Sequence, residues 1–329
     1  MLKKQENPTT LPGVFSTLAA GFELSTRYLW LMIVPALLDL FLWIGPRLSF
    51  RPLIESLAAQ LPPQALPLDL APVLDTYAAR LNHFTYLSVP LLGVPALMTG
   101  LTPEKTPIQP LVLERSGMGE WFGYFLLFTL GGLLLAAVYY SLIAYALSRA
   151  GASAAGTVVP PVRLGRRTVR TWLRLMGLAL MFLAFLVVVA FPTSIVVGFA
   201  SLLSQTLAVL ILMGALVLII WIVMFLSYTP QGMTLNPGRF APSLIESVRL
   251  FRANLPASLG LLFVVTLARR ALSLLLLTAD SGTWVTGINL LAHAYITTAL
   301  IVSMFIFYRD RYTASLQQTQ LPNNIEQVK

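Results

Sequence analysis

Five charged or polar residues interrupt long apolar runs of this sequence: Asp39, Arg269, Arg270, Asn289 and His293. The histidine follows the asparagine by four residues, which places both side chains on one face of a helix. A charged group at the centre of a membrane helix costs about 2.5–3.5 kcal/mol on insertion scales, so such groups seldom face lipid. We therefore treat these five residues as one candidate polar cluster inside a membrane.

Two interpretations of this cluster are open. In the first, Asp39 pairs with Arg269 or Arg270 and joins two membrane helices, with His293 hydrogen-bonded nearby. In the second, the same groups form a solvated pocket that binds or conducts an anionic solute or headgroup. A third arrangement, with both arginines reaching outward from a tilted helix, is disfavoured because residues 255–268 alone are too short to span a membrane.

Composition places the cluster in a membrane protein. Hydrophobic residues make up 57% of the chain and charged residues 11%, with a mean hydropathy of +0.78, whereas soluble proteins carry about 25% charged residues. The sequence has no cysteine, which excludes disulfides and thiolate metal sites. We find no catalytic or nucleotide-binding motif and no aromatic platform beside the basic residues. The sequence therefore predicts a non-enzyme without cofactor or metal, and no nucleic-acid partner.

Six segments are apolar and long enough to cross a membrane, at about 28–45, 122–148, 172–198, 204–228, 255–278 and 284–308. Arginines concentrate in the links after the second and fourth segments and after the sixth, whereas the links after the third and fifth have neither Lys nor Arg. Positive residues favour the cytoplasmic side. This distribution predicts a multi-pass protein of the bacterial inner membrane with both termini in the cytoplasm.

The link 46–121 then lies outside the membrane domain. It contains amphipathic patterns at Leu53–Leu61 and Leu70–Phe84, followed by the apolar stretch Phe84–Leu101, which Pro90, Gly93 and Pro95 interrupt. We interpret that stretch as interfacial or re-entrant. The link is therefore predicted to form a helical cap that lies on the membrane.

Three spans are preceded by short helical patterns, at 14–27, 162–171 and 242–254. Three units of lead-in helix plus hairpin would account for the chain, although short stretches also match by chance. The sequence thus predicts an all-α polytopic membrane protein: a cytoplasmic segment 1–27 with an amphipathic helix, a six-span domain 28–312, and a disordered cytoplasmic tail 313–329.

A basic stripe precedes the third span. Arg163, Arg167, Arg170 and Arg174 step by four, three and four, so they share one helical face. Such a face at the cytoplasmic surface would hold the headgroups of anionic membrane lipids. Ordinary positive-inside anchoring of the span is the alternative interpretation.

The second span carries the signals of close helix packing. Gly132 and Ala136 form a pair of small residues four apart, typical of tight contacts within a bundle or with a partner subunit. Tyr139, Tyr140 and Ser141 follow and are expected to form hydrogen bonds across helices.

One stretch has a pattern found in a known family. The chain resembles the membrane domain of some bacterial glycerophosphodiester phosphodiesterases and its stand-alone relatives, through Ser243, Ser247, Phe251 and Asn254 running into Leu259–Val265, and more faintly through Phe15–Tyr28. The resemblance implies a role in organising membrane or partner proteins. No catalytic residue carries over, because the phosphodiesterase domain is absent from the sequence.

Two functional hypotheses follow. The first is a non-catalytic scaffold or accessory subunit of a membrane complex, with lipids and membrane proteins as partners. The second is a transporter or lipid-handling protein that uses the candidate polar cluster to bind an anionic solute or headgroup.

Overall fold

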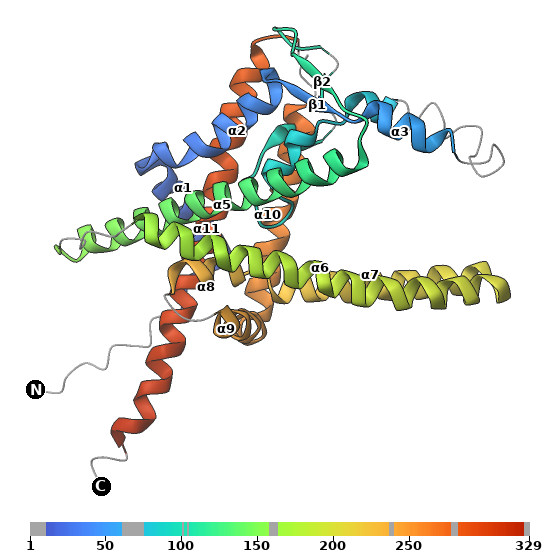
Figure 1. The fold of residues 1–329 in the computed structure, drawn as a ribbon. Helices are drawn as coiled ribbons and strands as arrows, with labels where there is room; N and C mark the ends of the chain where they lie inside the picture. Colours follow the sequence, from blue (N-terminus) through green and yellow to red (C-terminus); the bar gives the residue numbers. More distant parts are fainter. Residues whose placement is uncertain are drawn as a thin grey trace, which may run out of the picture. The chain divides into compact units, whose positions relative to one another are not determined.

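The structure is a computed structural model that describes residues 11–60, 76–100, 102–103, 105–157, 164–236, 240–277 and 282–325, with side chains to residue 317 (Figure 1). Within these residues the fold is all-α apart from one pair of three-residue strands. The chain divides into two compact units. Unit 1 comprises residues 1–26, 181–266 and 299–329, and unit 2 comprises residues 27–180 and 267–298.

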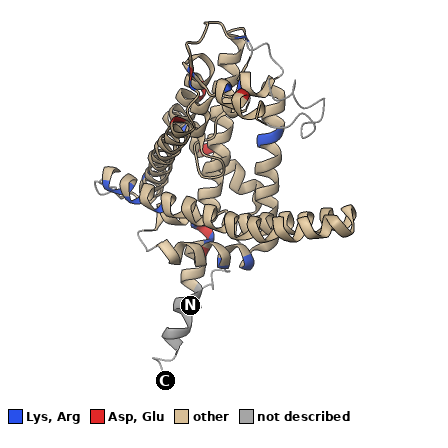
Figure 2. Ribbon diagram, turned by 45° about the vertical axis from the view of Figure 1, so that its right-hand side comes forward, with Lys and Arg blue, Asp and Glu red and all other residues tan. Residues whose placement is uncertain are grey.

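In the described part of the chain, five helical segments are long and apolar enough to cross a membrane: α5 (Met118–Ala154), α6 (Leu164–Leu203), α7 (Gln205–Phe225) with its continuation α8 (Thr229–Leu235), α10 (Leu255–Leu276) and α11 (Val285–Ile325). They coincide with the second to sixth predicted spans. Charged residues lie mostly near helix ends and in loops, and the long helices are otherwise nearly free of them (Figure 2). The fold is thus an all-α polytopic membrane protein, as predicted.

The first predicted span, about 28–45, corresponds to two short helices that follow a bend after the predicted lead-in helix 14–27. Helix α1 (Val14–Arg27) is separated from η1 (Leu29–Met32) and α2 (Ile33–Ile44) by Tyr28, whose φ of −126° and ψ of 59° are not helical. Residues 29–44 are fewer than the 20 or so that a straight crossing needs. A sixth span therefore exists only if the bent pair of α1 with η1 and α2 is counted as one.

Unit 2 is organised around α5, whose buried face includes Leu133, Ala136, Ala137 and Ile143. The short helix η3 (His83–Ser88) packs along it. Strands β1 (Arg47–Ser49) and β2 (Val112–Glu114) pair in parallel, with Leu48 opposite Leu113. The described part of the 46–121 insert also contains helix α3 (Arg51–Ala58), helical residues 76–80 and η4 (Leu97–Thr99).

The segment predicted as interfacial or re-entrant lies against the middle of α5. A Cβ at Gly132 would lie 2.5 Å from the Leu87 carbonyl oxygen, so only glycine admits this approach. The backbone there is satisfied locally: Ser88 Oγ donates to Val94 O at 2.6 Å and Gly93 N to Val89 O at 2.7 Å. Val89, Val94 and Leu97 of this segment are buried, whereas Leu91 is 74% exposed. Its interfacial or re-entrant position in the membrane stays a prediction.

Unit 1 has an aromatic core near α8. The ring of Tyr228 stacks on Phe307 at a centroid distance of 5.2 Å, and Phe251 contacts Phe225 edge to face at 5.1 Å. Helix α9 (Phe240–Ala253) contributes Phe251 and packs against α7 and α8.

Helices α1 and α9 bury the same pattern of positions. The buried set of α1 is Thr17, Gly21, Leu24 and Ser25, and that of α9 is Ser243, Ser247, Leu250 and Phe251. The spacing is identical, which favours a repeated lead-in helix in these two places. The remaining predicted lead-in helix, 162–171, is not a separate helix, because α6 runs without interruption from Leu164.

Two further expectations differ from the structure. The tail predicted to be disordered from residue 313 is helical as far as Ile325. Residues 313–321 contain no Gly or Pro, and extending an existing helix avoids the cost of nucleating a new one. In the insert, α3 matches the first amphipathic pattern. Of the second pattern, 70–84, residues 70–75 lie outside the described residues, and residues 76–80 are helical.

Candidate functional site

The charged centre of unit 2 is a pair formed by Asp39 and His293. Asp39 lies on the buried face of α2 with Leu38 and Leu42, and His293 lies on the buried face of α11 beside Ala294. Their exposed fractions are 0% and 3%. His293 Nδ1 is 3.2 Å from Asp39 Oδ2, so residues 254 positions apart in the sequence join two helices.

The second carboxylate oxygen of Asp39 binds the segment 84–101 of the insert. The Met98 backbone N–H in η4 donates to Asp39 Oδ1 at 2.9 Å. Each oxygen of the buried carboxyl group therefore has a polar partner, as a buried polar group requires. Asp39 thus links α2 to both α11 and η4.

Neither arginine of the predicted cluster pairs with Asp39, so the proposed Asp–Arg ion pair is wrong. Arg269 and Arg270 are both exposed on α10, and neither forms an ion pair within the described part of the chain. Arg269 lies close enough to the hydroxyls of Tyr139 and Tyr140 to interact with them electrostatically. A histidine and a backbone N–H already satisfy the carboxylate, so no guanidinium is needed beside it.

Asn289 serves a different part of unit 2. Its Nδ2 donates to the carbonyl oxygen of Leu276, the last residue of α10, at 3.0 Å. The final carbonyls of a helix have no partner within the helix. Asn289 therefore caps α10 from α11 and fixes the α10–α11 hairpin, rather than joining the Asp39–His293 pair.

The prediction that residues 139–141 of α5 form hydrogen bonds across helices is confirmed for Tyr139. Tyr139 OH donates to Thr298 Oγ1 of α11 at 3.0 Å in a fully buried contact, and Tyr140 OH reaches Gly93 O at 3.4 Å. Ser141 is buried but has no hydrogen-bond partner for its hydroxyl. Polar contacts from α5 thus reach both α11 and the segment 84–101.

The basic stripe lies at the start of α6, where Arg170 is exposed and Arg167 and Arg174 are partly buried. Arg163 lies outside the described residues. In the next turn, Trp172 Nε1 donates to Leu130 O of α5 at 3.1 Å and fixes the rotation of α6. Anionic-lipid binding by this stripe stays a prediction.

Unit 1 contains a polar cluster that the sequence did not reveal. Tyr308 OH donates to Glu246 Oε2 at 3.0 Å, and Asn236 Nδ2 lies 2.9 Å from the same hydroxyl and 3.3 Å from the carboxylate. Next to it, Arg311 is 5% exposed, donates to Pro12 O at 3.1 Å and stacks 3.4 Å above the Phe307 ring. The sequence signal that could have indicated this cluster is Glu246, a carboxylate within the amphipathic helix α9.

His83, the second histidine, lies in an aromatic cage in the insert. Its ring contacts Phe50 at 4.3 Å, Tyr86 at 5.2 Å and Trp121 at 5.8 Å, and its Nε2 has no hydrogen-bond partner. Burial lowers the pKa of His83 to about 4. The described residues contain no group of three potential metal ligands that would include it.

Acid is expected to destabilise the native insert through His83. The unfolded-state pKa is about 6.5, so the unfolded chain takes up the proton first, and the stability present above that pH falls as the pH drops toward about 4. We expect a loss of about 1 kcal/mol by pH 5.5. Thermal unfolding of the wild type and His83→Leu between pH 7.5 and 5 measures it. All other titrating groups are the same in the two proteins. If the melting temperatures of wild type and His83→Leu changed equally with pH, His83 would not be the cause of the acid destabilisation.

Comparison of the whole chain with known proteins gives no match to a family model, a curated protein or a solved structure. The resemblance to the phosphodiesterase-linked membrane domain therefore stays a prediction.

Proposed function

We propose that this protein is a non-catalytic scaffold or accessory subunit of a membrane complex. The observation that supports this proposal is that Asp39 and His293 are buried and are already bonded within the protein. Asp39 and His293 are almost completely enclosed, and both oxygens of the carboxylate bond within unit 2. A catalytic or transport site needs charged groups that a substrate can reach, whereas this pair fits a structural role.

The proposal includes a place in the cell. We assign the protein to the bacterial inner membrane with both termini in the cytoplasm. The arginines of the links after the second and fourth predicted spans and of the stretch after the sixth support this orientation, since positive residues favour the cytoplasmic side.

Isolation in a mild detergent, followed by identification of copurifying proteins, tests the scaffold proposal. We expect a membrane protein to copurify in a fixed ratio and to be crosslinked to the chain in intact cells. A chain that purifies alone, shows no crosslinked partner, and transports a solute saturably after reconstitution would contradict the proposal.

A second candidate, a transporter or lipid-handling protein, is favoured by the two arginines of α10. Both Arg269 and Arg270 are exposed inside an apolar helix, and Arg269 lies near two tyrosine hydroxyls. A guanidinium in such a place is costly unless water, lipid headgroups or a ligand contact it.

Replacing Arg269 and Arg270 by leucine, one at a time, separates the two candidates. Because neither guanidinium has an ion-pair partner in the described structure, we expect each variant to fold with the stability of the wild type or to gain as much as about 2.5–3.5 kcal/mol. Thermal unfolding in detergent measures this effect. Retained partner binding would favour the scaffold, whereas intact folding with loss of solute or lipid binding would favour the second candidate.

A further inference from the structure

Helix α9 has one buried face and one exposed face. The inward face buries Ser243 and Ser247 together with Leu250 and Phe251, and Ser247 Oγ donates to Phe225 O at 2.9 Å. The outward face carries Ile245, which is 69% exposed. A large apolar side chain exposed beside arginines is expected where a helix face meets a lipid surface.

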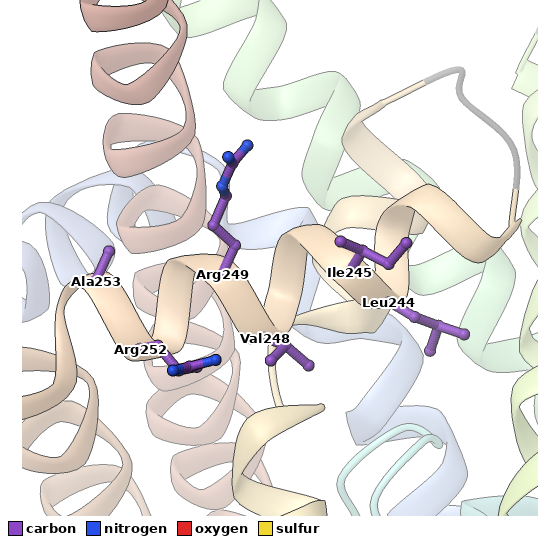
Figure 3. Close-up of a pocket in the computed structure, with 6 residues that line it drawn as sticks. All are labelled: Leu244, Ile245, Val248, Arg249, Arg252 and Ala253. Atoms are coloured by element: carbon purple, nitrogen blue, oxygen red, sulfur yellow. The ribbon is translucent and has the colours of Figure 1, made fainter.

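The outward face holds a groove of about 720 Å³, lined by Leu244, Ile245, Val248, Arg249, Arg252 and Ala253 (Figure 3). The six residues form two adjacent stripes, each with four-residue spacing. Apolar side chains occupy the N-terminal part of the groove, and the two arginines occupy the part nearer the C-terminus of α9. One end therefore suits a hydrocarbon chain and the other end suits an anion.

The two arginines of the groove are available for binding. Arg249 and Arg252 are exposed, and within the described residues neither forms an ion pair or a side-chain hydrogen bond. An exposed guanidinium without a carboxylate partner can donate to phosphate oxygens in charge-assisted hydrogen bonds.

The connections of α9 place the groove beside membrane helices. The Ser247 hydrogen bond attaches α9 to Phe225, the last residue of α7, and α10 begins at Leu255, two residues after α9 ends. A short amphipathic helix held between the ends of two spans lies at the height of lipid headgroups.

We propose that the outward groove of α9 binds one anionic phospholipid. The lipid phosphate lies between Arg249 and Arg252, and an acyl chain covers Leu244, Ile245 and Val248. This site is separate from the basic stripe of α6 and does not depend on the scaffold role.

The test uses the full-length protein in phosphatidylcholine vesicles that contain a minor fraction of fluorescent phosphatidylglycerol. Energy transfer from the protein's tryptophans, with unlabelled phosphatidylglycerol as competitor, gives the apparent lipid affinity. We expect Arg249→Gln and Arg252→Gln each to weaken it about 5-fold and the double variant about 30-fold, since a basic residue near an anionic surface contributes about 1 kcal/mol.

The matched control removes two positive charges elsewhere. Lys105→Gln with Arg115→Gln changes the net charge equally, and both residues are exposed in the insert. This control is expected to bind phosphatidylglycerol like the wild type. An equal loss in control and groove variants would overturn the proposal, because net charge alone would then explain the binding.

Two more variants cover the case in which the glutamine double variant does not fold. Arg249→Lys with Arg252→Lys keeps the charge and is expected to retain most of the affinity, and Ile245→Gln is expected to weaken binding several-fold by exposing the acyl chain. Inorganic phosphate serves as a competitor at millimolar concentration. Wild-type affinity in Ile245→Gln, or complete competition by free phosphate, would overturn a lipid site.

Discussion

Replacing Asp39 by alanine is expected to lower the free energy of unfolding by about 2–6 kcal/mol, because two buried polar groups lose their partner at about 1–3 kcal/mol each. His293 Nδ1 and the Met98 N–H would both lose their acceptor. The loss should appear as a marked fall in melting temperature in detergent or nanodiscs. It should also appear as faster hydrogen exchange at Met98, which reports the release of the segment 84–101.

Two variants of α2 provide the comparison. Asp39→Asn keeps an acceptor for the Met98 N–H and loses only the charge, so we expect a smaller loss of about 1–3 kcal/mol. Leu37→Ala truncates a side chain that is 59% exposed on the same helix and should leave exchange at Met98 unchanged. If Asp39→Ala matched Leu37→Ala in both readouts, the carboxylate would not be the anchor of this segment.

The sequence was sufficient to predict five of the six spans and to select Asp39 and His293, which are both buried. Hydropathy over about 20 residues is a strong signal, and α5, α6, α7, α10 and α11 lie where the apolar runs are. A charge inside such a run must be buried or solvated, which is why Asp39 and His293 could be selected without knowing which groups they contact.

The partner of Asp39 could not be predicted in the same way. Charge complementarity favoured Arg269 or Arg270, but the rotation of α10 exposes both arginines. The groups that contact the carboxyl group are the imidazole of His293 and the backbone N–H of Met98 in η4. Periodicity gives the face of a residue on its own helix, not which helix or loop that face meets.

The Gly132–Ala136 pair illustrates the same limit. Its small residues predicted a close contact, and the structure confirms one, although the contact at Gly132 is with the backbone of Leu87 rather than with another spanning helix. The spacing of small residues reports that something approaches closely. The identity of the approaching segment comes only from the tertiary fold.

Replacing Gly132 by alanine is the second change with a large expected effect. The new Cβ would lie 2.5 Å from Leu87 O and 2.8 Å from Leu87 C, and backbone atoms cannot move aside as a flexible side chain can. Overpacking of this kind costs about 1–3 kcal/mol or more. The neighbouring Gly131 gives a matched control, because its Cβ would meet only Leu87 Cδ2, at 3.5 Å.

The two alanine variants should therefore differ in sign. Gly131→Ala removes backbone freedom from the unfolded chain without a clash and is expected to be neutral or up to about 1 kcal/mol more stable. Gly132→Ala should unfold at a lower temperature and should speed hydrogen exchange in residues 87–93. Equal melting temperatures for the two variants would mean that the segment does not lie against α5 at Leu87. Combining Gly132→Ala with Asp39→Ala then tests whether both residues hold the same segment. Because each change alone would already release the segment, the double variant should lose less stability than the sum of the losses in the two single variants.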